Sequence, residues 1–273
     1  MTPRSAVPFP PIAGERNSGA GVLLMRWLPP ALVLATLIGL WQVAASTGAV
    51  ADALSLEPFL VPSPTEIAAS LWENRALLAE NAWVTLREIL FGFLCALAAG
   101  VGFAVALHLS ATLRRALYPL VVASQTVPII VVAPILVVWF GYGIGPKLAI
   151  VALICFFPIA VNTLDGLRSV DPEATKMMRT LDASRGQILW RVEAPTALPY
   201  AFSGARIAVA VAVIGAVFGE WAGSDSGLGH MMLQDNAQLE TARLFAAVTV
   251  LSAIAVALFG LLALVERRVV HWR

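Results

Sequence analysis

Long apolar stretches, separated by shorter polar ones, make up most of this chain. Six of them are long enough to cross a bilayer, at about residues 27–45, 89–109, 117–140, 148–166, 200–222 and 244–265. A helix needs about 20 predominantly apolar residues to cross the hydrocarbon core, where its backbone groups must bond to one another. The pattern therefore predicts an all-α integral membrane protein with six transmembrane helices.

The segments around the first apolar stretch have other patterns. Residues 1–26 are rich in proline, glycine and serine without any periodicity, which is typical of a disordered tail. A cleavable signal peptide is the alternative for the first stretch, since Arg26 precedes it, but the later stretches favour an uncleaved helix. Residues 46–81 are mixed and amphipathic. We expect residues 27–273 to form one transmembrane domain.

The long polar interruption in the second half of the chain is residues 171–199, which we call the elbow. Asp171 is a suitable N-cap, and Pro172 a suitable first residue, for a helix that runs to about Leu181. A charged helical segment between apolar stretches is a poor membrane segment but a good docking surface, because its polar face is wet. Its soft apolar side chains are those of Met177, Met178 and Leu181.

A second helix of the elbow is expected after a break at Asp182 and Ala183. Ser184 and Gln187, three residues apart, form the pattern of a capping box at its start. We expect this helix to continue until Pro195. The elbow is therefore predicted to consist of two short helices that meet at a bend.

Composition and charge place the chain in a membrane and orient it there. With 59% hydrophobic and 13% charged residues, it is too apolar for an ordinary soluble domain. In a six-helix topology with the N-terminus inside, thirteen Lys and Arg residues face the cytoplasm, four face outward, and Arg206 lies within a helix. Because cytoplasmic loops carry the excess of Lys and Arg, both termini and the elbow are expected in the cytoplasm.

Small residues recur at four-residue spacing in two of the apolar stretches. In the second stretch they are Gly92, Ala96, Gly100 and Ala104, and in the fifth they are Gly204, Ala208, Ala212 and Ala216. This spacing places them on one face of a helix, where neighbouring backbones can approach closely in lipid. We expect two closely packed helices.

A few polar residues lie within or at the edge of the apolar stretches. Gln125, Thr126 and Pro128 fall in the third, and proline frees a carbonyl that is tolerated in lipid only against protein or a water-filled cavity. We therefore expect this helix to line a solute pathway, with packing against a neighbouring helix as the alternative for Gln125. Asn162 and Glu220 are further pathway candidates. For Glu220, near the outer interface, capping or hydrogen bonding is the alternative.

The sequence contains no group of residues suited to catalysis or metal binding. Cys95 and Cys155 lie in apolar stretches and are expected as small core residues. The segment GYGIGPK at 141–147 has the wrong spacing for a phosphate-binding loop. We expect no catalytic residue, no metal and no cofactor.

Several segments resemble one family of membrane proteins. The run TLDASRGQILWRVEAPTALP resembles the EAA loop of ABC importer permeases, and QTVPIIVVAPILVVWFGYGIGPK resembles permeases of the nitrate, sulfonate and taurine type. The segments GYG-x-GPK, FFPI-x-VNT and DGLRSVDPE look most like the branch for thiamine-precursor pyrimidines, with riboflavin importers as relatives. The resemblance covers roughly residues 60–270 and implies the type I ABC importer (MetI-like) permease fold.

The resemblance implies a partner for the elbow. In such permeases this loop is the coupling helix, which inserts into a cleft of the ABC ATPase subunit, and ATP is used by that separate subunit. The implied docking residues are Glu173, Lys176, Met177, Met178, Arg179, Leu181, Asp182, Ala183 and Ser184. The chain departs from the family pattern with Lys-Met-Met at 176–178 in place of Glu-Ala-Ala. It also has Asp182 in place of a glycine, whose left-handed conformation Asp tolerates at some cost.

The resemblance also implies the remaining partners and the function. A permease of this kind moves a small solute inward across the cell inner membrane by alternating access, with a solute-binding protein and a second permease copy. Residues 223–243 resemble the Gly-Leu-Gly turn and short gating helix of these permeases, where the binding protein would dock. No nucleic-acid partner is expected.

The solute class is less strongly indicated than the family. A sulfonate, taurine or nitrate is one alternative, and a buried basic residue would favour such an anion. Arg206 is the only Lys or Arg well inside a predicted span, and it lies toward the cytoplasmic end. A pyrimidine or another vitamin-like compound is therefore favoured. An ion-coupled secondary transporter is a weaker alternative, because no acidic residue lies at mid-membrane depth.

Overall fold

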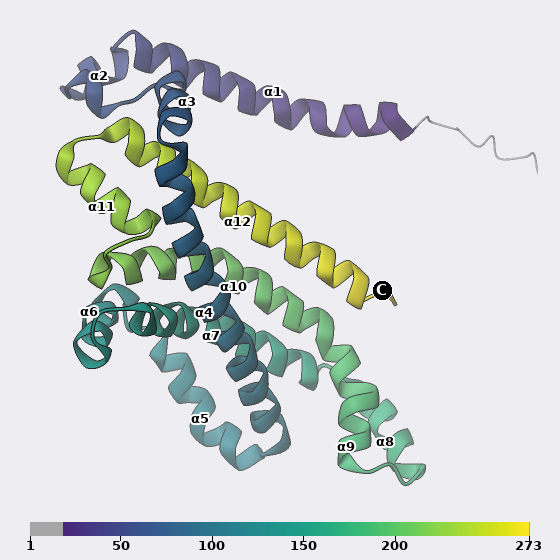
Figure 1. Cartoon of the computed structure of the whole chain (residues 1–273). Helices are drawn as coiled ribbons and strands as arrows, with labels where there is room; N and C mark the ends of the chain where they lie inside the picture. Colours follow the sequence, from purple (N-terminus) through teal and green to yellow (C-terminus); the bar gives the residue numbers. More distant parts are fainter. Residues whose placement is uncertain (1–18, 273) are drawn as a thin grey trace, which may run out of the picture. The chain divides into compact units, whose positions relative to one another are not determined.

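The structure is a computed structural model that describes residues 19–272. Within that range every regular element is a helix and there is no β-strand (Figure 1). The chain divides into two compact units, residues 1–64 and residues 65–273. The predicted all-α architecture is confirmed, whereas residues 1–18 of the predicted tail lie outside the described residues.

The N-terminal unit contains α1 (Gly19–Ser46), α2 (Ala49–Leu54) and the 3-10 turn η1 (Pro58–Leu60). Residues 19–26 form the first turns of α1 rather than part of a tail. The part of α1 from Leu28 to Ser46 is apolar and long enough to cross a membrane, as predicted. Gly48 has a left-handed backbone (φ 72°), which a glycine adopts without steric cost where the chain turns from α1 into α2.

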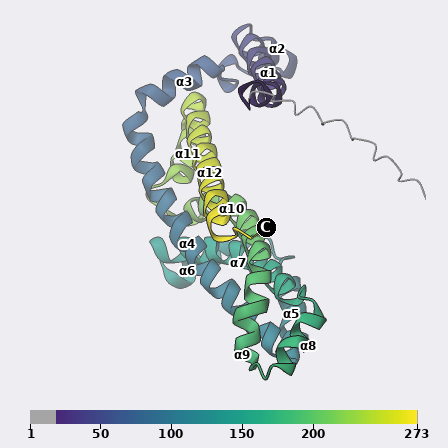
Figure 2. The same cartoon turned by 90° about the vertical axis from the view of Figure 1, so that its right-hand side faces the viewer.

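The larger unit supplies the other membrane-spanning helices (Figure 2). Its elements are α3 (Pro64–Glu73), α4 (Arg75–Leu109), α5 (Ala111–Ser124), α6 (Ile129–Phe140), α7 (Ile144–Arg168), α8 (Pro172–Thr180), α9 (Arg185–Ile188), the π-helical segment η2 (Leu189–Glu193), α10 (Ala194–Gly223), α11 (Leu228–Gln238) and α12 (Thr241–Val269). Helices α4, α7 and α12 and the continuous run from Arg185 to Gly223 are each long and apolar enough to span. With α1, and with α5 and α6 counted as one bent span, the six predicted spans are present.

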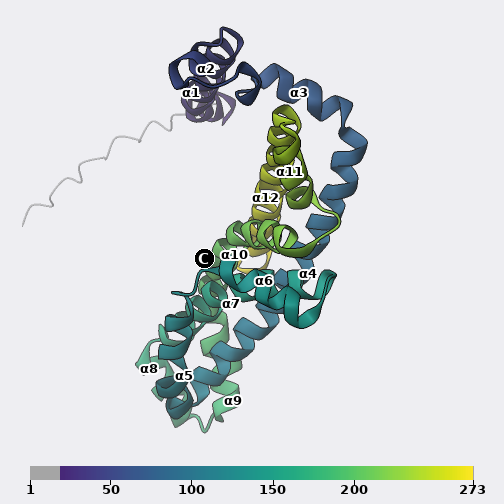
Figure 3. The ribbon, with the colours of Figure 1, turned by 90° about the vertical axis from the view of Figure 1, so that its left-hand side faces the viewer.

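The third predicted span is broken rather than straight (Figure 3). Helices α5 and α6, which occupy most of residues 111–140, are bent by 101° at the break between them. Pro128 stands there in an extended conformation (φ −64°, ψ 121°) at the N-cap of α6. A proline donates no backbone hydrogen bond and disfavours helical conformation in the residue before it, so the expected single helix stops and restarts.

The second helix of the elbow does not end at Pro195, as the sequence predicted. Helix α9 continues through η2 into α10, so that residues 185–223 form one helical run. Pro195 lies in the first turn of α10, directly after the π-helical segment. The π turn changes the hydrogen-bond register just before the proline, and the chain passes it without leaving the helix.

Helices α4, α7 and α10 form the main core of the larger unit. The small residues lie where these helices meet, as their spacing predicted: Gly100 faces Ile159, and Gly204 faces the backbone of Pro158. Cys155 belongs to this core as expected, whereas Cys95 is exposed on α4. Close packing of the three helices provides the frame that holds the polar residues described below.

The contact of α10 with α7 at Gly204 predicts a large effect for one added methyl group. A Cβ atom at Gly204 would lie 2.5 Å from the carbonyl oxygen of Pro158, closer than van der Waals contact allows. Gly204→Ala therefore forces the helices apart, and we expect it to cost about 1–3 kcal/mol, the usual penalty of overpacking. The measurement is the thermal unfolding midpoint of the detergent-solubilised protein.

Gly102→Ala is the matched control for this substitution. Gly102 also lies within a span, but a Cβ atom there would have no atom within 4 Å. Because alanine has the higher helix propensity, this variant should be as stable as the parent or slightly more stable. Equal unfolding midpoints for the two variants would contradict the close approach at Gly204.

Candidate functional site

The first helix of the elbow, α8, is capped as predicted. The Asp171 carboxylate accepts a hydrogen bond from the backbone N–H of Glu173 (2.9 Å), and Pro172 is the first helical residue. The helix ends at Thr180, and Asp182 then adopts a left-handed backbone with φ 55°. Asp182 thus has the conformation for which the EAA pattern uses glycine.

The second helix of the elbow also starts as predicted, and it is tied to the bundle. The backbone N–H of Gln187 donates to the Ser184 hydroxyl (3.3 Å), and the backbone N–H of Ser184 donates to the Gln187 side chain (2.8 Å). Further along, Glu193 in η2 pairs with His108 at the end of α4 (2.9 Å). The elbow is therefore attached to the spans through both α10 and α4.

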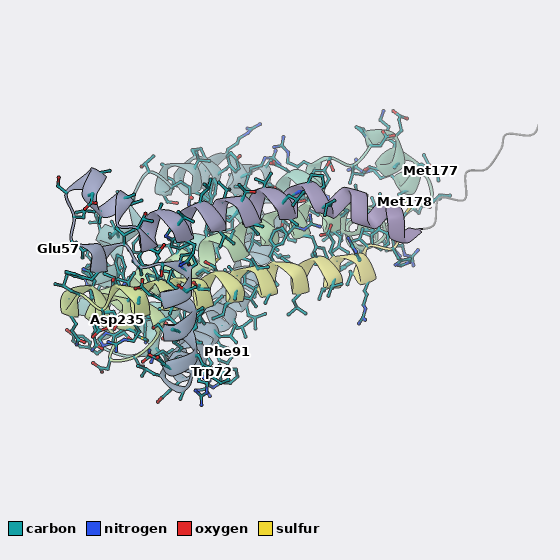
Figure 4. All side chains as sticks on the ribbon, turned by 90° about the horizontal axis from the view of Figure 1, so that it is seen from above. Glu57, Trp72, Phe91, Met177, Met178 and Asp235 are labelled. Carbon is teal, nitrogen blue, oxygen red and sulfur yellow. The ribbon has the colours of Figure 1, made fainter. Side chains whose placement is uncertain are left out.

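The surface of the elbow combines polar groups with exposed apolar side chains. Met177 is 64% exposed and Leu181 is 68% exposed, whereas Met178 is half-buried. Figure 4 shows Met177 and Met178 at the opposite end of the larger unit from Asp235. The pair between Lys176 and Glu173 (2.8 Å) is fully in solvent and adds little stability.

Most of the residues expected to dock a partner are accessible. Those that are exposed are Glu173, Lys176, Met177, Arg179, Leu181, Asp182 and Ser184, and Met178 and Ala183 are half-buried. Large apolar side chains that stand exposed on a short, well-capped polar helix offer area that a partner can cover. This arrangement is suited to insertion into an apolar cleft.

The predicted pathway residues do not form one cluster. Gln125 and Pro128, at the break between α5 and α6, line a cavity of about 460 Å³ together with Leu153 and Ile154 of α7. Thr126 is exposed beside them, and its hydroxyl donates to the carbonyl of Ala123 (2.8 Å). Only the residues at this break are therefore placed side by side.

Asn162 lies apart from the cavity, against α10. Its side-chain amide donates to the carbonyl of Pro158 (2.7 Å), and its Cβ would be 2.9 Å from a Cβ at Gly204. The amide is thus engaged within α7, at the contact with α10. In this conformation Asn162 is placed as a packing residue.

Glu220 is 1% exposed, so in this conformation it offers no surface to a solute. One carboxylate oxygen accepts from the Thr85 hydroxyl (2.6 Å). The other accepts from the backbone N–H groups of Gly229 (2.5 Å) and His230 (3.3 Å). The pathway role expected for Glu220 is therefore corrected here to the alternative, hydrogen bonding within the protein.

A buried ion pair near Glu220 was missed by the sequence reasoning. Lys147 of α7 is 5% exposed, and its Nζ lies 2.5 Å from Glu88 of α4 and donates to the Ser224 hydroxyl (2.8 Å). The sequence pattern predicts that Lys147 is one of the four outward-facing basic residues, because the apolar stretch begins at residue 148. In the sequence, Glu88 lies directly before the apolar stretch 89–109, and Lys147 lies directly before the stretch 148–166. These matching positions of two opposite charges were the sequence signal for an ion pair.

The sequence of this chain is similar to those of known transport proteins. Residues 92–271 match the family described as binding-protein-dependent transport system inner membrane component. The formylaminopyrimidine transport permease protein ThiX of Halalkalibacterium halodurans is 35% identical over 247 residues, which cover 90% of this chain and 96% of ThiX. The riboflavin transport system permease protein RibX of Chloroflexus aurantiacus is 36% identical, covering 90% of this chain and 89% of RibX.

A more distant relative and a solved structure extend the comparison. The taurine transport system permease protein TauC of Escherichia coli is 30% identical, covering 88% of this chain and 87% of TauC. A chain of the inward-facing MetNI methionine ABC transporter superposes with a TM-score of 0.60 at 22% identity, covering 72% of this chain and 96% of its own length. At that identity the superposition concerns the fold alone, and the fold is the one expected from the sequence.

Proposed function

The chain belongs to the family of binding-protein-dependent transport system inner membrane components, and we propose that an ATPase subunit drives it through the elbow. It is the membrane-spanning permease subunit of an ABC importer and not an enzyme. Its partners as a class are ATPase subunits and a solute-binding protein. The chain itself uses no cofactor in this proposal, because ATP is bound by the separate subunit.

The observation that carries the proposal is the form of the elbow. Leu181 and Met177 stand exposed at the end of a capped helix, where the cleft of an ATPase subunit can bury them. The elbow passes without a break into the span that ends at Gly223. A displacement of the docked elbow is therefore transferred directly to a membrane-spanning helix.

The transport cycle follows from two such permeases and two ATPase subunits. The excess of Lys and Arg on one side supports a cytoplasmic position for both termini and the elbow, on the side where ATP is found. ATP draws the ATPase subunits and the two elbows together, which tilts the spans and opens the pathway outward. Hydrolysis reverses the movement, as in alternating access by rigid-body rocking.

A neutral, pyrimidine-like or vitamin-like solute is the favoured cargo. The relatives named for formylaminopyrimidine and riboflavin are 35% and 36% identical, against 30% for the one named for taurine. Lys147, the one fully buried cation among the described residues, is paired with Glu88, and Arg206 is paired with Glu266. An anionic solute would need a cation that is free to receive it.

Uptake by cells that express the chain with its ATPase and binding protein tests the proposal. We expect accumulation of labelled formylaminopyrimidine, loss of accumulation when the ATPase is omitted, and no competition by excess taurine. Accumulation of taurine instead would support the sulfonate and taurine alternative. Accumulation without the ATPase would contradict the permease's dependence on it.

The broken span gives a prediction about solute preference. Gln125 lines the cavity beside Pro128 with an amide that has no side-chain partner among the described residues. If this helix lines the pathway, Gln125→Leu should raise the KM for uptake several-fold, because a polar contact with the solute is lost. Gln125→Asn keeps an amide and should change the KM less. Unchanged uptake kinetics in the leucine variant would instead assign Gln125 to packing.

A further inference from the structure

Side chains of two spans satisfy the N-terminus of helix α11. The first four N–H groups of a helix have no partner within it. Here the N–H of Gly227 donates to Asn81 Oδ1 (2.8 Å), and that of Leu228 donates to Thr85 Oγ1 (2.9 Å). The N–H groups of Gly229 and His230 both donate to Glu220, as described above. All four groups are therefore bonded to side chains of α4 or α10, which we call the α11 anchor.

Glu220 is the central group of the α11 anchor. It is the only acidic member, and its two oxygens accept three of the hydrogen bonds of the anchor. It accepts one of them from the Thr85 hydroxyl, which links the anchoring side chains of α4 to that of α10. Because it is excluded from water, each hydrogen bond to its carboxylate is costly to lose.

The Gly-Leu-Gly turn is explained by the position of this carboxylate. A Cβ atom at Gly227 would overlap the Glu220 carboxylate, and the Gly227 backbone (φ 113°) is one that side chains rarely adopt. A Cβ at Gly229 would lie 2.7 Å from Glu220 Oε2. Two glycines are thus required for the turn to approach the carboxylate closely.

The loop before α11 is held by neighbouring contacts of the same kind. Ser224, bonded to Lys147, donates its hydroxyl to the carbonyl of Ser226 (2.5 Å). The indole N–H of Trp221 donates to the carbonyl of Gly229 (2.9 Å). At its other end α11 is paired with α12 through Asp235 and Arg243. Short connections on both sides therefore leave α11 little freedom to move independently of the spans.

The position of Glu220 links the two ends of the larger unit. It lies near the end of the helical run 185–223, and the elbow lies at the start of that run. The same helix thus carries the proposed docking surface at one end and the principal anchor of α11 at the other. Any tilt of this helix displaces the Glu220 carboxylate and the amides bonded to it.

We propose that Glu220 is a positioning residue that makes α11 move with α10, so that displacement of the elbow at one end of the larger unit reaches α11 at the other. This inference rests on the proposed function, which supplies the ATPase and the orientation. Glu220 acts through the backbone of α11 and touches no solute. Asn81 and Thr85 fix the other side of the same helix terminus to α4.

Amide hydrogen exchange of the full chain tests the anchor without any partner. In Glu220→Gln, which keeps the volume but replaces one acceptor oxygen with an NH₂ group, the amides of Gly229 and His230 should exchange about ten- to a hundredfold faster. Asn81→Ala, at a half-buried position where folding is not at risk, should accelerate only the amide of Gly227. Glu80→Gln is the control, because Glu80 is exposed on α4 beside the anchor, and it should change none of them.

The transfer of movement is tested in the complex with the ATPase. The reporter is Asn236→Cys, at an exposed position of α11, in a chain whose Cys95 and Cys155 are replaced by alanine. Its rate of reaction with a membrane-impermeant maleimide is compared with ADP and with ATP plus vanadate. We expect a nucleotide-dependent change in the parent and in Glu80→Gln. The change should be lost in Glu220→Gln although ATP hydrolysis continues.

Two results would overturn the inference, and they differ from failure of the proposed function. One is unchanged exchange at Gly229 and His230 in Glu220→Gln. The other is a nucleotide response in Glu220→Gln equal to that of the parent. If the parent itself gives no response with the ATPase bound, the proposed drive through the elbow is wrong, and the transfer of movement with it.

Discussion

Leu181→Asp is expected to abolish ATP-driven uptake and the stimulation of ATP hydrolysis, while the chain still inserts in the membrane. Leu181 is 68% exposed at the end of α8, and its burial in an apolar cleft of the ATPase would contribute about 1.5–3 kcal/mol. An aspartate loses that contribution and must also be desolvated without a partner, which costs more. Uptake, ATP hydrolysis and the amount of chain in the membrane are measured in parallel.

Leu56→Asp is the matched control for this substitution. Leu56 is also an exposed leucine, and it lies in a non-helical stretch of the N-terminal unit, far along the chain from the elbow. The same change of charge there should leave uptake and ATP hydrolysis near the level of the parent. Uptake that survives in Leu181→Asp would show that the elbow is not the docking surface.

The second large effect is expected at the buried ion pair. Lys147→Met removes the cation that is paired with Glu88, a carboxylate that is 1% exposed and whose second oxygen has no hydrogen-bond partner among the described residues. Breaking a buried pair in this way leaves a charge without compensation and costs about 3–5 kcal/mol. We expect a strongly lowered unfolding midpoint and yield of the detergent-solubilised protein.

A double variant distinguishes a lost ion pair from a lost side chain. With Glu88→Gln added, no uncompensated charge remains, so most of the stability of Lys147→Met should return. Lys176→Met serves as the control for removal of a lysine, since its pair with Glu173 is exposed and worth at most about 1 kcal/mol. A double variant less stable than Lys147→Met would contradict this account of the pair.

The features that sequence reasoning predicted correctly are local ones. The cap at Asp171, the capping box at Ser184 and the left-handed Asp182 each depend on residues within three positions of one another. The spans depend only on the length of apolar stretches, and the close helix contacts depend only on spacing within one helix. Such features are visible in a single sequence because the chain itself brings the residues together.

The features that were missed depend on residues far apart along the chain. Thr85 and Glu220, which share a hydrogen bond, are separated by 135 positions. Lys147 was assigned to a loop because α7 begins at Ile144, four residues before the apolar stretch was taken to start. A periodicity argument locates helix ends only within a few residues, so it cannot decide whether a charge at such an end is exposed or buried.

Both wrong predictions of where a helix breaks or ends concern a proline. The sequence predicted one span over residues 117–140 with Pro128 inside it, but the chain bends by 101° at the break where Pro128 lies. It treated Pro195 as the end of a helix, but the π-helical segment before it lets the helix continue. The outcome at each proline depends on whether neighbouring turns can adjust, which tertiary packing decides.

Access to the elbow from the two sides of the membrane tests the central claim most directly. A Thr180→Cys variant, in a chain without its two native cysteines, places a reactive thiol at an exposed position of the elbow. An impermeant maleimide should leave it unlabelled in intact cells, label it in inverted vesicles stripped of the ATPase, and fail again when the ATPase is added back. Labelling in intact cells, or labelling unaffected by the ATPase, would contradict the account.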